Sequence, residues 1–312
     1  MTCFVTFTPN PALDLSTSVE RLVEAHKLRC GAVLRHPGGG GINVARVLHR
    51  LGAEVRALYP AGGPTGERLH QLLSDEGVPD QPWTIADETR ENFTVHERST
   101  GREYRFVLPG PMLGPHDWQA GLLHLQQCTP MPRWIISSGS LPPGVDTDGH
   151  AQVARLARKM GARMVVDSSG EALSSALAQG VWLFKPSLRE LQELSAAALP
   201  TPGLQKEAAR LLIAAGKTHM VALSLGSEGA MLVTADQCLH ASALPVKAQG
   251  SVGAGDSFLA GLLWALDAGT GLEEALATAV AAGTAAVMTT GTTLCQREEV
   301  MHLRQKVQVR AA

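Results

Sequence analysis

The sequence predicts an α/β fold of three layers, with helices on both faces of a mostly parallel central sheet. Short apolar or β-branched runs alternate along the chain with longer stretches of helical periodicity, and this alternation is typical of parallel sheets. The composition agrees with it. Of the 312 residues, 45% are hydrophobic but only 4% are aromatic, which suits closely packed helices and sheet better than a β-sandwich.

The expected elements follow one another in a regular order. The apolar runs predict strands at 3–8, 54–60, 133–138, 162–168, 181–186 and 219–225. The helical patterns lie between them, and several end at a glycine, as helix C-termini do: 42–52, 66–77, 148–161, 171–180 and 204–217. Right-handed crossovers in such a sheet place ligands beyond the carboxyl ends of the strands, so a site is expected in the loops that follow strands.

Two stretches interrupt the alternation, residues from about 12 to 36 and from about 89 to 109. Both show period-two patterning with charged residues interleaved, and the letters STGRE at 99–103 indicate a hairpin. We expect a small β-sheet that the rest of the chain does not absorb, which is either a lid over the site or an insertion without a role. The chain as a whole, 1–312, is expected to form one domain.

Charge and targeting signals exclude several classes of function. With 27 basic and 29 acidic residues the formal charge is −2, so no overall field attracts nucleic acid or an anionic membrane. No basic segment precedes an apolar run at the start, and Asp267, Glu273 and Glu274 interrupt the apolar stretch at 258–290. Five cysteines without a CxxC pair fit a reduced compartment, each as a small buried hydrophobe. We therefore expect a cytoplasmic protein with no membrane or nucleic-acid partner.

Two glycine clusters stand directly before predicted helices: HPGGGGINVAR at 36–46 and GSVGAGDSF at 250–258. The second is not a dinucleotide fingerprint, because Phe258 occupies its sixth position and helix follows where a strand with an acidic residue is required. GKT at 216–218 is not a phosphate-binding P-loop, because Leu211 stands where the first glycine is needed and a strand follows.

The second cluster has a different use. The backbone N–H groups of Gly253, Ala254 and Gly255 can converge at a helix N-terminus, where they hold negative charge as it develops on a phosphoryl group. Asp256 follows at once and is placed to take a proton from an attacking hydroxyl. Its alternative role is that of a helix cap.

An ordered set of motifs resembles the ribokinase-like carbohydrate kinases, also called the phosphofructokinase B family. The motifs are NPALD at 10–14, PGGGGINVAR at 37–46, SGSLPPG at 138–144, DSSGEAL at 167–173, KPS at 185–187, LSLGSEGA at 223–230 and GAGDSF at 253–258. The resemblance covers essentially the whole chain. It implies a ribokinase-like α/β/α domain with a β lid and an ATP- and Mg²⁺-dependent sugar kinase.

The second glycine cluster lacks the Asp-Thr-Thr lead-in common among kinases of nucleosides and unphosphorylated sugars, which favours the phosphosugar branch. The resemblance then implies phosphorylation of fructose 6-phosphate at its 1-hydroxyl. The alternatives are tagatose 6-phosphate, fructose 1-phosphate at its 6-hydroxyl, and a sugar-phosphate sensor that has lost its chemistry.

The resemblance also implies roles for individual residues. Asp256 would be the general base, with 253–255 as the anion hole. The sugar hydroxyls would be held by Asp14, Asn43 and the backbone of Gly39 and Gly40. The substrate phosphate would be bound by Arg90, Lys27, Arg29 and Arg105, with a hydroxyl from Ser140. In related kinases the lid of one subunit reaches the neighbour's site, so a homodimer is implied, in which Lys27 acts in trans.

The nucleotide and metal sites are implied in the same way. ATP would lie along Lys185, Ser187, Ser224, Gly226 and Gly229, with its adenine flanked by Val246, Val280 and Gly283. Mg²⁺ is expected near Glu190, although Ser187 replaces the asparagine of the family motif in this segment, and a hydroxyl cannot offer the paired donor and acceptor of an amide. A K⁺ site is implied at carbonyls near Gly250, Val252, Ala286, Thr289 and Gly291. The resemblance further implies inhibition by ATP at a second site.

Overall fold

The computed structural model describes residues 4–312. Its centre is a ten-stranded sheet in the order β14-β13-β12-β11-β10-β9-β8-β1-β4-β5. All pairs from β11 to β5 are parallel, and the three pairs from β11 to β14 are antiparallel. The strands are β1 Phe4–Phe7, β4 Val55–Ala61, β5 Asp80–Thr84, β8 Trp134–Ser138, β9 Arg163–Asp167, β10 Val181–Phe184, β11 Thr218–Ser224, β12 Ala230–Val233, β13 Cys238–Ala241 and β14 Val309–Ala311.

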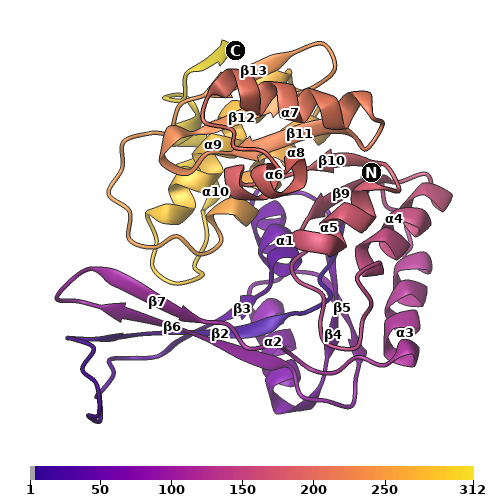
Figure 1. Ribbon diagram of the computed structural model, residues 1–312. Coiled ribbons are helices and arrows are strands. Elements are labelled where there is room, and N and C mark those ends of the chain that lie inside the picture. The colour runs from indigo at the N-terminus through magenta and orange to yellow at the C-terminus, as the bar shows by residue number, and fades with distance from the viewer. Residues whose placement is uncertain (1–3) are drawn as a thin grey trace.

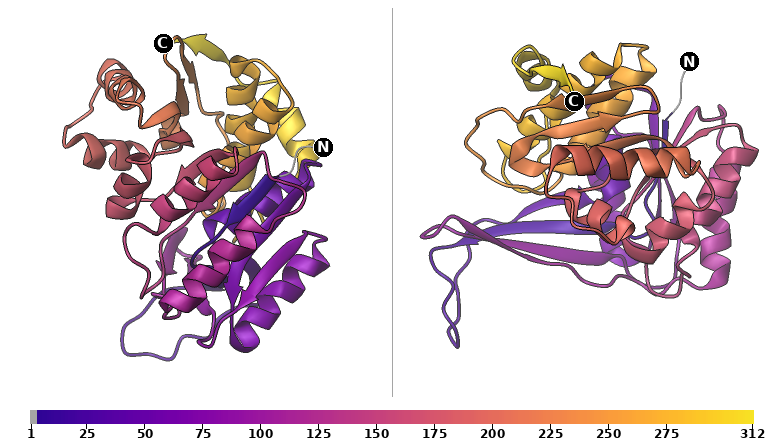
Figure 2. Two further views of the ribbon diagram at one scale, coloured as in Figure 1. Left: turned by 90° about the vertical axis from the view of Figure 1, so that its right-hand side faces the viewer. Right: turned by 45° about the horizontal axis from the view of Figure 1, so that its top comes forward.

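Helices cover both faces of this sheet, as Figures 1 and 2 show. Because neighbouring side chains of a strand point to opposite faces, two apolar clusters form: Trp134 and Ile136 lie in one, and Ile135 lies in the other. The first cluster includes α1 Gly40–Arg50, α2 Gly63–Asp75, α8 Ala254–Asp267, α9 Leu272–Val287 and α10 Arg297–Arg304. The second includes α3 Pro115–Gln126, α4 Gly149–Lys159, α5 Gly170–Leu177, α6 Leu188–Ser195 and α7 Pro202–Ala214. The predicted three-layer α/β class is confirmed.

A second, four-stranded sheet in the order β3-β2-β6-β7 projects from the body (Figure 1). Its strands are β2 Ala12–Val19, β3 Leu34–Gly38, β6 Arg90–Glu97 and β7 Arg102–Phe106. They come from the two stretches that interrupt the α/β alternation in the sequence. We call this the small sheet.

The two faces of the small sheet differ in polarity. Asp14 pairs with Asn92 in the register of β2 and β6, and Thr94 pairs with Arg105, so this face is polar. The next pairs, Leu15 with Phe93 and Phe93 with Phe106, place apolar side chains on the other face, and both phenylalanines are exposed. The polar face is the one directed at the body, because Asp14 and Asn92 are buried there.

The cysteines follow the prediction only in part. Cys128, Cys238 and Cys295 are buried, whereas Cys30 is exposed in the loop between β2 and β3, so its interpretation as a buried hydrophobe is wrong. Cys3 lies outside the described residues. Within residues 4–312 no helix has the length and apolar content needed to cross a membrane.

Candidate active site

Two helix N-termini that are far apart in the sequence meet in the structure. Asn43 lies in the first turn of α1 and Asp256 in the first turn of α8. The amide Nδ2 of Asn43 donates a hydrogen bond of 2.8 Å to Oδ2 of Asp256, across 213 residues of sequence. The two glycine clusters therefore lie at the same site.

The glycines at the start of α1 are required by close packing. A Cβ atom at Gly40 would lie 2.2 Å from Oγ of Ser138 at the end of β8, and one at Gly41 would lie 2.4 Å from Oγ1 of Thr8. Gly39 has φ +111°, a conformation that other residues rarely adopt. Any side chain here would push α1 away from the strand ends, so the glycines bring Asn43 up to Asp256.

The start of α8 is crowded at Gly253 and open at Gly255. Gly253 needs its freedom, because its φ is +77° and a Cβ would lie 2.2 Å from the Leu294 side chain. At Gly255 a Cβ would meet only the Lys185 ammonium, at 3.4 Å. The first N–H groups of a helix have no intrahelical acceptor, so this uncrowded turn can receive an anion beside a lysine.

A charged pair, Lys185 and Asp167, lies beside the base candidate. Nζ of Lys185 lies 3.1 Å from Oδ1 of Asp167, which ends strand β9. Burial raises the pKa of Asp256 to about 6, and the nearby Asp167 carboxylate adds to the rise, while the Asn43 hydrogen bond, Lys185 and Arg105 oppose it. Burial acts to lower the pKa of Lys185, but Asp167 and Asp256 outweigh burial and raise it, so this lysine stays protonated. Asp256 is thus a carboxyl group whose pKa lies nearer to physiological pH than an ordinary aspartate's, as a general base requires.

The sugar-side candidates fall into two groups. Asp14 is buried, and its carboxylate accepts from Asn92 Nδ2 at 2.9 Å and from Thr292 Oγ1 at 3.1 Å. A Cβ at Gly38 would collide with that carboxyl group, which explains one more glycine of the first cluster. Ser140 is exposed and accepts from Asn10 Nδ2 at 3.3 Å.

The four cations proposed for the substrate phosphate are not brought together within one chain. Arg90 donates to the carbonyls of Asn10, Pro11 and Leu108, at 2.8, 3.3 and 2.6 Å, and so joins these segments. Arg105 lies on the polar face of the small sheet, and its charge acts on both Arg90 and Asp256. Lys27 and Arg29 are exposed in the loop 20–33, which hangs from the small sheet away from the body (Figure 1).

On the nucleotide side, Ser187 has a structural role. It caps α6, and a capping box joins it to Glu190: Ser187 N and Oγ donate to Glu190 Oε2 at 2.7 and 2.9 Å, and Glu190 N donates back. Ser224 donates to the Pro186 carbonyl at 3.2 Å, so these two predicted segments lie side by side.

The remaining nucleotide candidates form a looser set. Gly226 starts the short 3₁₀ helix Gly226–Glu228, and Gly229 has φ +101° with the Ala241 carbonyl where its Cβ would be, so turn geometry alone accounts for both. On α9, Val280 is buried, whereas Gly283 lies against the Ala254 carbonyl at the start of α8. Val246 lies in the loop before α8, half-buried.

The donor atoms around Glu190 decide whether it fits a role in binding Mg²⁺. Residues 4–312 contain no group of three His, Cys, Asp or Glu side chains that could hold a metal ion. Mg²⁺ in phosphoryl-transfer sites needs only one or two carboxylates beside the substrate phosphates, and the capping box uses one oxygen of Glu190, so this residue fits such a role.

For K⁺ the relevant donors are backbone carbonyls. Gly250, Thr289 and Gly291 lie together: a Cβ at Gly250 would be 3.2 Å from the Thr289 carbonyl and 3.9 Å from the Gly291 N–H. The Ala286 carbonyl already accepts from Thr289 N and Oγ1, at 3.1 and 2.8 Å. Val252, between this group and α8, is half-buried.

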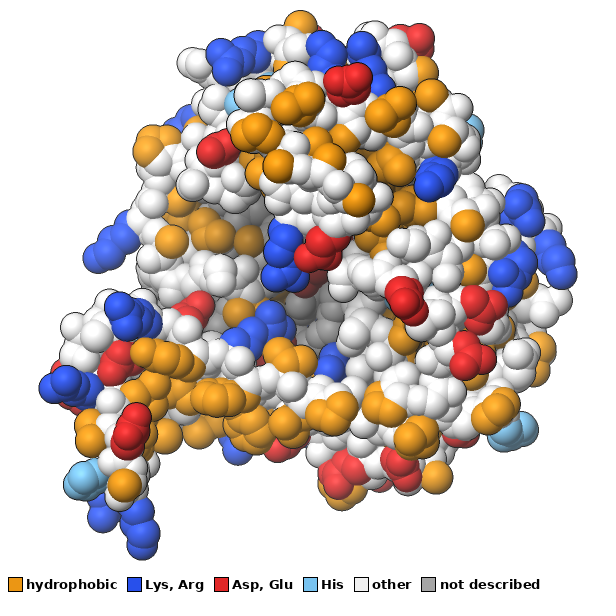
Figure 3. All heavy atoms as spheres, in the orientation of Figure 1, with side chains coloured by type: hydrophobic (Ala, Val, Ile, Leu, Met, Phe, Trp, Pro, Cys, Tyr) orange, Lys and Arg blue, Asp and Glu red, His pale blue; other side chains and the backbone are white. Residues whose placement is uncertain are grey.

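A hollow of about 910 Å³ separates the polar face of the small sheet from the loops before α8 and after α9. Figure 3 shows the face of the molecule on which the body stands apart from the projecting sheet. The lining residues include Ser16, Thr94, Glu103, Gln249 and Gly291, but not Asp256 or Lys185. The hollow therefore lies between the small sheet and the body, and the Asn43–Asp256 pair is not part of its lining.

Comparison with known proteins identifies the family. The pattern of the pfkB family carbohydrate kinases matches residues 10–299. The chain belongs to this family. It is 43% identical over 296 residues to the ATP-dependent 6-phosphofructokinase isozyme 2 of Mycobacterium tuberculosis, covering 95% of this chain and 87% of the relative. It is 34% identical over 308 residues to the 1-phosphofructokinase of Vibrio cholerae, covering 98% and 96%.

Solved structures agree with this pfkB assignment. Phosphofructokinase-2 from Escherichia coli in complex with fructose-6-phosphate superposes with a TM-score of 0.92 at 39% identity, and its complex with potassium superposes at 0.93 and 40%. Each covers 98% of this chain and 99% of that one. The predicted resemblance to the ribokinase-like kinases is confirmed, and the chain is a pfkB carbohydrate kinase.

Sequence reasoning missed several residues that build the site. Asp167 and Ser138 each end a parallel strand, and a polar residue at that position was the available signal. Asn92 and Thr292, which hold Asp14, have no local signal in the sequence. Arg46, which lies behind Asn43, is the last residue of the PGGGGINVAR motif, but the motif gave it no role.

Proposed function

We propose that this pfkB kinase transfers the γ-phosphoryl group of ATP to the 1-hydroxyl of fructose 6-phosphate and forms fructose 1,6-bisphosphate. The observation that carries the proposal is the hydrogen bond from Asn43 to Asp256, which unites a sugar-binding candidate with a base candidate at the N-terminus of α8. The name of the Mycobacterium tuberculosis relative and the fructose-6-phosphate complex of the Escherichia coli enzyme support the choice of substrate.

In the proposed mechanism Asp256 accepts the proton of the attacking hydroxyl on its carboxylate as the hydroxyl oxygen bonds to the γ-phosphorus. The bond from that phosphorus to the β–γ bridging oxygen breaks, and ADP leaves. Asn43 holds the carboxylate by Oδ2 and so orients it toward the sugar. Lys185 and the N–H groups of 253–255 stabilise the negative charge on the phosphoryl oxygens. Mg²⁺, for which Glu190 is the candidate ligand, would neutralise charge on the ATP phosphates.

Binding of the substrate phosphate is proposed to involve the small sheet. Arg105 and Arg90 lie toward the body on the side of Asp14, where a closed sheet would exclude water from the reacting atoms. Lys27 and Arg29 would reach the site of a second copy, with the exposed apolar face of the small sheet as the contact between subunits. A bound K⁺ at the Gly250, Thr289 and Gly291 backbone is part of the same proposal.

The main rivals share the fold. The relative from Vibrio cholerae is a 1-phosphofructokinase, and tagatose 6-phosphate differs from fructose 6-phosphate only in one hydroxyl configuration. A non-catalytic sensor is the rival from another class. Its one support is Ser187, which is engaged in the α6 cap where the family motif has an asparagine.

A kinetic panel tests the proposal. The purified chain is assayed with MgATP and each of fructose 6-phosphate, tagatose 6-phosphate and fructose 1-phosphate, with ADP release and sugar bisphosphate measured together. We expect kcat/KM for fructose 6-phosphate to exceed the others by at least about tenfold, the scale of a few polar contacts. A preference for fructose 1-phosphate would move the chain to the rival activity. If none of the three sugars gives coupled ADP release, the non-catalytic sensor becomes the better interpretation.

A further inference from the structure

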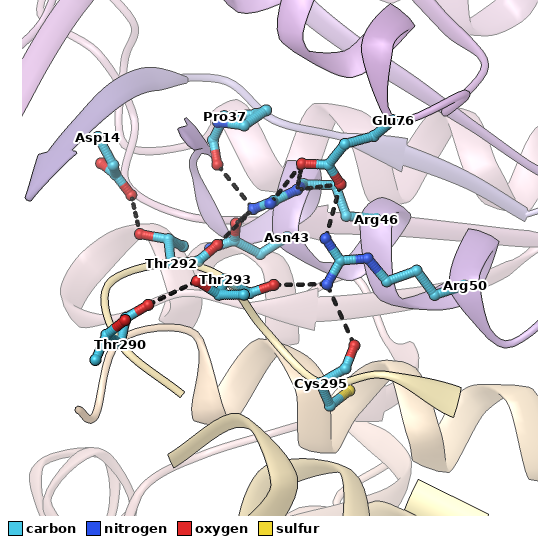
Figure 4. A network of polar contacts seen from close by, with 10 residues as sticks. All are labelled: Asp14, Pro37, Asn43, Arg46, Arg50, Glu76, Thr290, Thr292, Thr293 and Cys295. Carbon is cyan, nitrogen blue, oxygen red and sulfur yellow. Dashed lines mark hydrogen bonds and ion pairs between the residues drawn. The ribbon is translucent and has the colours of Figure 1, made fainter. Parts of the chain in front are cut away.

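A buried guanidinium lies directly behind the Asn43–Asp256 pair. Arg46 is on α1, one turn after Asn43, and is completely buried. Its Nε and Nη2 donate to the Glu76 carboxylate at 2.6 to 3.0 Å. Its Nη1 donates to the Thr292 carbonyl at 2.9 Å, the Pro37 carbonyl at 3.1 Å and Oδ1 of Asn43 at 3.4 Å (Figure 4).

We infer that Arg46 is a positioning residue that fixes the orientation of the Asn43 amide, and through it the catalytic carboxylate; the inference rests on the proposed role of Asp256. A guanidinium can only donate hydrogen bonds, and an ionised carboxylate can only accept them. An asparagine between the two has one orientation that satisfies both. Its Oδ1 must turn to Arg46 and its NH₂ to Asp256, as the structure has them.

The same guanidinium also reaches the other sugar candidate. The carbonyl of Thr292 accepts from Arg46, and the hydroxyl of Thr292 donates to Oδ2 of Asp14 at 3.1 Å. The carbonyl of Pro37 precedes the glycine cluster that leads into α1. One side chain therefore holds three segments that converge on the substrate: the end of β3, the first turn of α1 and the 292 region.

Stability alone does not account for a charge at this place. A buried ion pair costs desolvation, and an apolar residue of similar volume often stabilises a fold as well. Glu76 also pairs with Arg50, at 2.9 Å, and Arg50 donates to the carbonyls of Thr293 and Cys295. Arg50 thus ties α1 to the same two regions as Arg46 does, but makes no contact with Asn43. This makes Arg50 the matched control.

The test compares Arg46→Lys with Arg50→Lys in the full-length enzyme, assayed with the phosphosugar that the wild type turns over best. Lysine keeps the charge but cannot reach Glu76, Pro37, Thr292 and Asn43 at once. For Arg46→Lys we expect kcat to fall about tenfold or more, since small misplacements of reacting groups cost that much. Arg50→Lys should lose thermal stability while its kcat stays within about twofold of wild type, because no catalytic candidate contacts it.

The pH profile gives the second measurement. Four groups act on Asp256: Asp167 from β9, Lys185 after β10, Arg105 from β7 and Asn43 from α1. Only the Asn43 bond depends on Arg46. Loss of a hydrogen bond to the charged form raises the pKa of a carboxyl group, so the acid limb of kcat should move to higher pH in Arg46→Lys and stay in place in Arg50→Lys.

The inference is overturned if Arg46→Lys is folded and keeps the wild-type kcat and acid limb, or if Arg50→Lys changes both as strongly. Should Arg46→Lys be insoluble, Glu76→Gln replaces it. That variant keeps Arg46 but weakens the hydrogen bonds that its guanidinium donates to residue 76. For Glu76→Gln we expect kcat to fall about twofold to fivefold and the acid limb of kcat to move to higher pH. A wild-type kcat and an unmoved acid limb would overturn the inference. A wild type inactive on all three phosphosugars refutes the proposed function instead.

Discussion

The two glycine-rich helix starts look alike in the sequence and differ in the structure. At the start of α1 the glycines are closely packed, because Ser138 and Thr8 occupy the spaces where Cβ atoms would lie at Gly40 and Gly41. Within α8, Gly255 has only the Lys185 ammonium as a neighbour, at ordinary contact distance. The first start is packed against protein at both glycines, whereas the second is packed against Leu294 at Gly253 and is open at Gly255, beside a cation.

The difference indicates two uses of the same residue. Glycine at α1 allows a helix to approach strand ends, so that Asn43 is held at a fixed distance from Asp256. Glycine at α8 leaves backbone N–H groups uncovered, so that an anion can approach them. Packing should therefore dominate the effect of substitutions at the first start, and chemistry at the second.

The largest expected effect comes from the base itself. Asp256→Asn keeps the size and the helix start but cannot take a proton, so kcat should fall by roughly three decades or more while KM for both substrates changes little. Steady-state kinetics with the preferred phosphosugar measures it. Turnover within tenfold of wild type would refute the role of Asp256 as base.

The stability of the same variant is its control. The pKa of Asp256 is raised in the fold to about 6 from an ordinary 3.8, so wild type loses stability as the pH rises through this interval and a buried charge forms. Asp256→Asn avoids that loss. It should be more stable than wild type by up to about 3 kcal/mol at pH 7.5, with the gain vanishing near pH 4. A variant less stable at pH 7.5 would show that the loss of activity reflects a damaged fold.

A matched pair of glycine substitutions contrasts the two starts directly. Gly255→Ala introduces a methyl group that only Lys185 contacts, so the fold should keep its stability while kcat falls about tenfold to a hundredfold, the scale of a lost anion-hole donor. Gly41→Ala places its methyl 2.4 Å from Thr8 Oγ1 and should cost about 1–3 kcal/mol of unfolding free energy.

Thermal unfolding and kcat per folded molecule are measured for both variants. If Gly255→Ala loses stability and keeps kcat, or Gly41→Ala does the reverse, the distinction between packing and anion binding is wrong.

The smallest effect is the pH dependence of the wild type. Because a base must be deprotonated and the pKa of Asp256 is about 6, kcat/KM should be level above pH 7 and fall about tenfold per unit below pH 6. Stopped assays between pH 5 and 8 measure this limb. An acid limb near pH 4 would mean that the pKa of Asp256 is not raised or that Asp256 is not the base.

Much of the fold could be predicted because local pattern and global structure agree. The six predicted strands correspond to β1, β4 and β8–β11, all buried runs whose residues have apolar neighbours on both faces. The pattern does not predict β5, which carries Pro82 and lies at the edge of the sheet, nor the short antiparallel strands β12–β14. β5 and β14 are the edge strands, where partial exposure constrains the composition less, whereas β12 and β13 are interior strands of only four residues each.

The site divides in a similar way. The sequence determines which groups are available: glycines where backbone must be uncovered, Asp256 behind an anion hole, and motifs whose order resembles that of the pfkB kinases. These follow from residues that are neighbours in the chain. Their individual roles stay predictions that the experiments above decide.

Only the tertiary structure decides which of these groups meet. It joins Asn43 to Asp256, Lys185 to Asp167 and Asp14 to Thr292. It leaves Lys27 exposed in a loop directed away from the body, and it engages Ser187 in a helix cap. It also shows the contacts of Arg46, a residue that in the sequence is only one charge on an amphipathic helix. The physical reason is that a hydrogen bond between residues 213 positions apart depends on how strands and helices pack, and no local pattern records that distance.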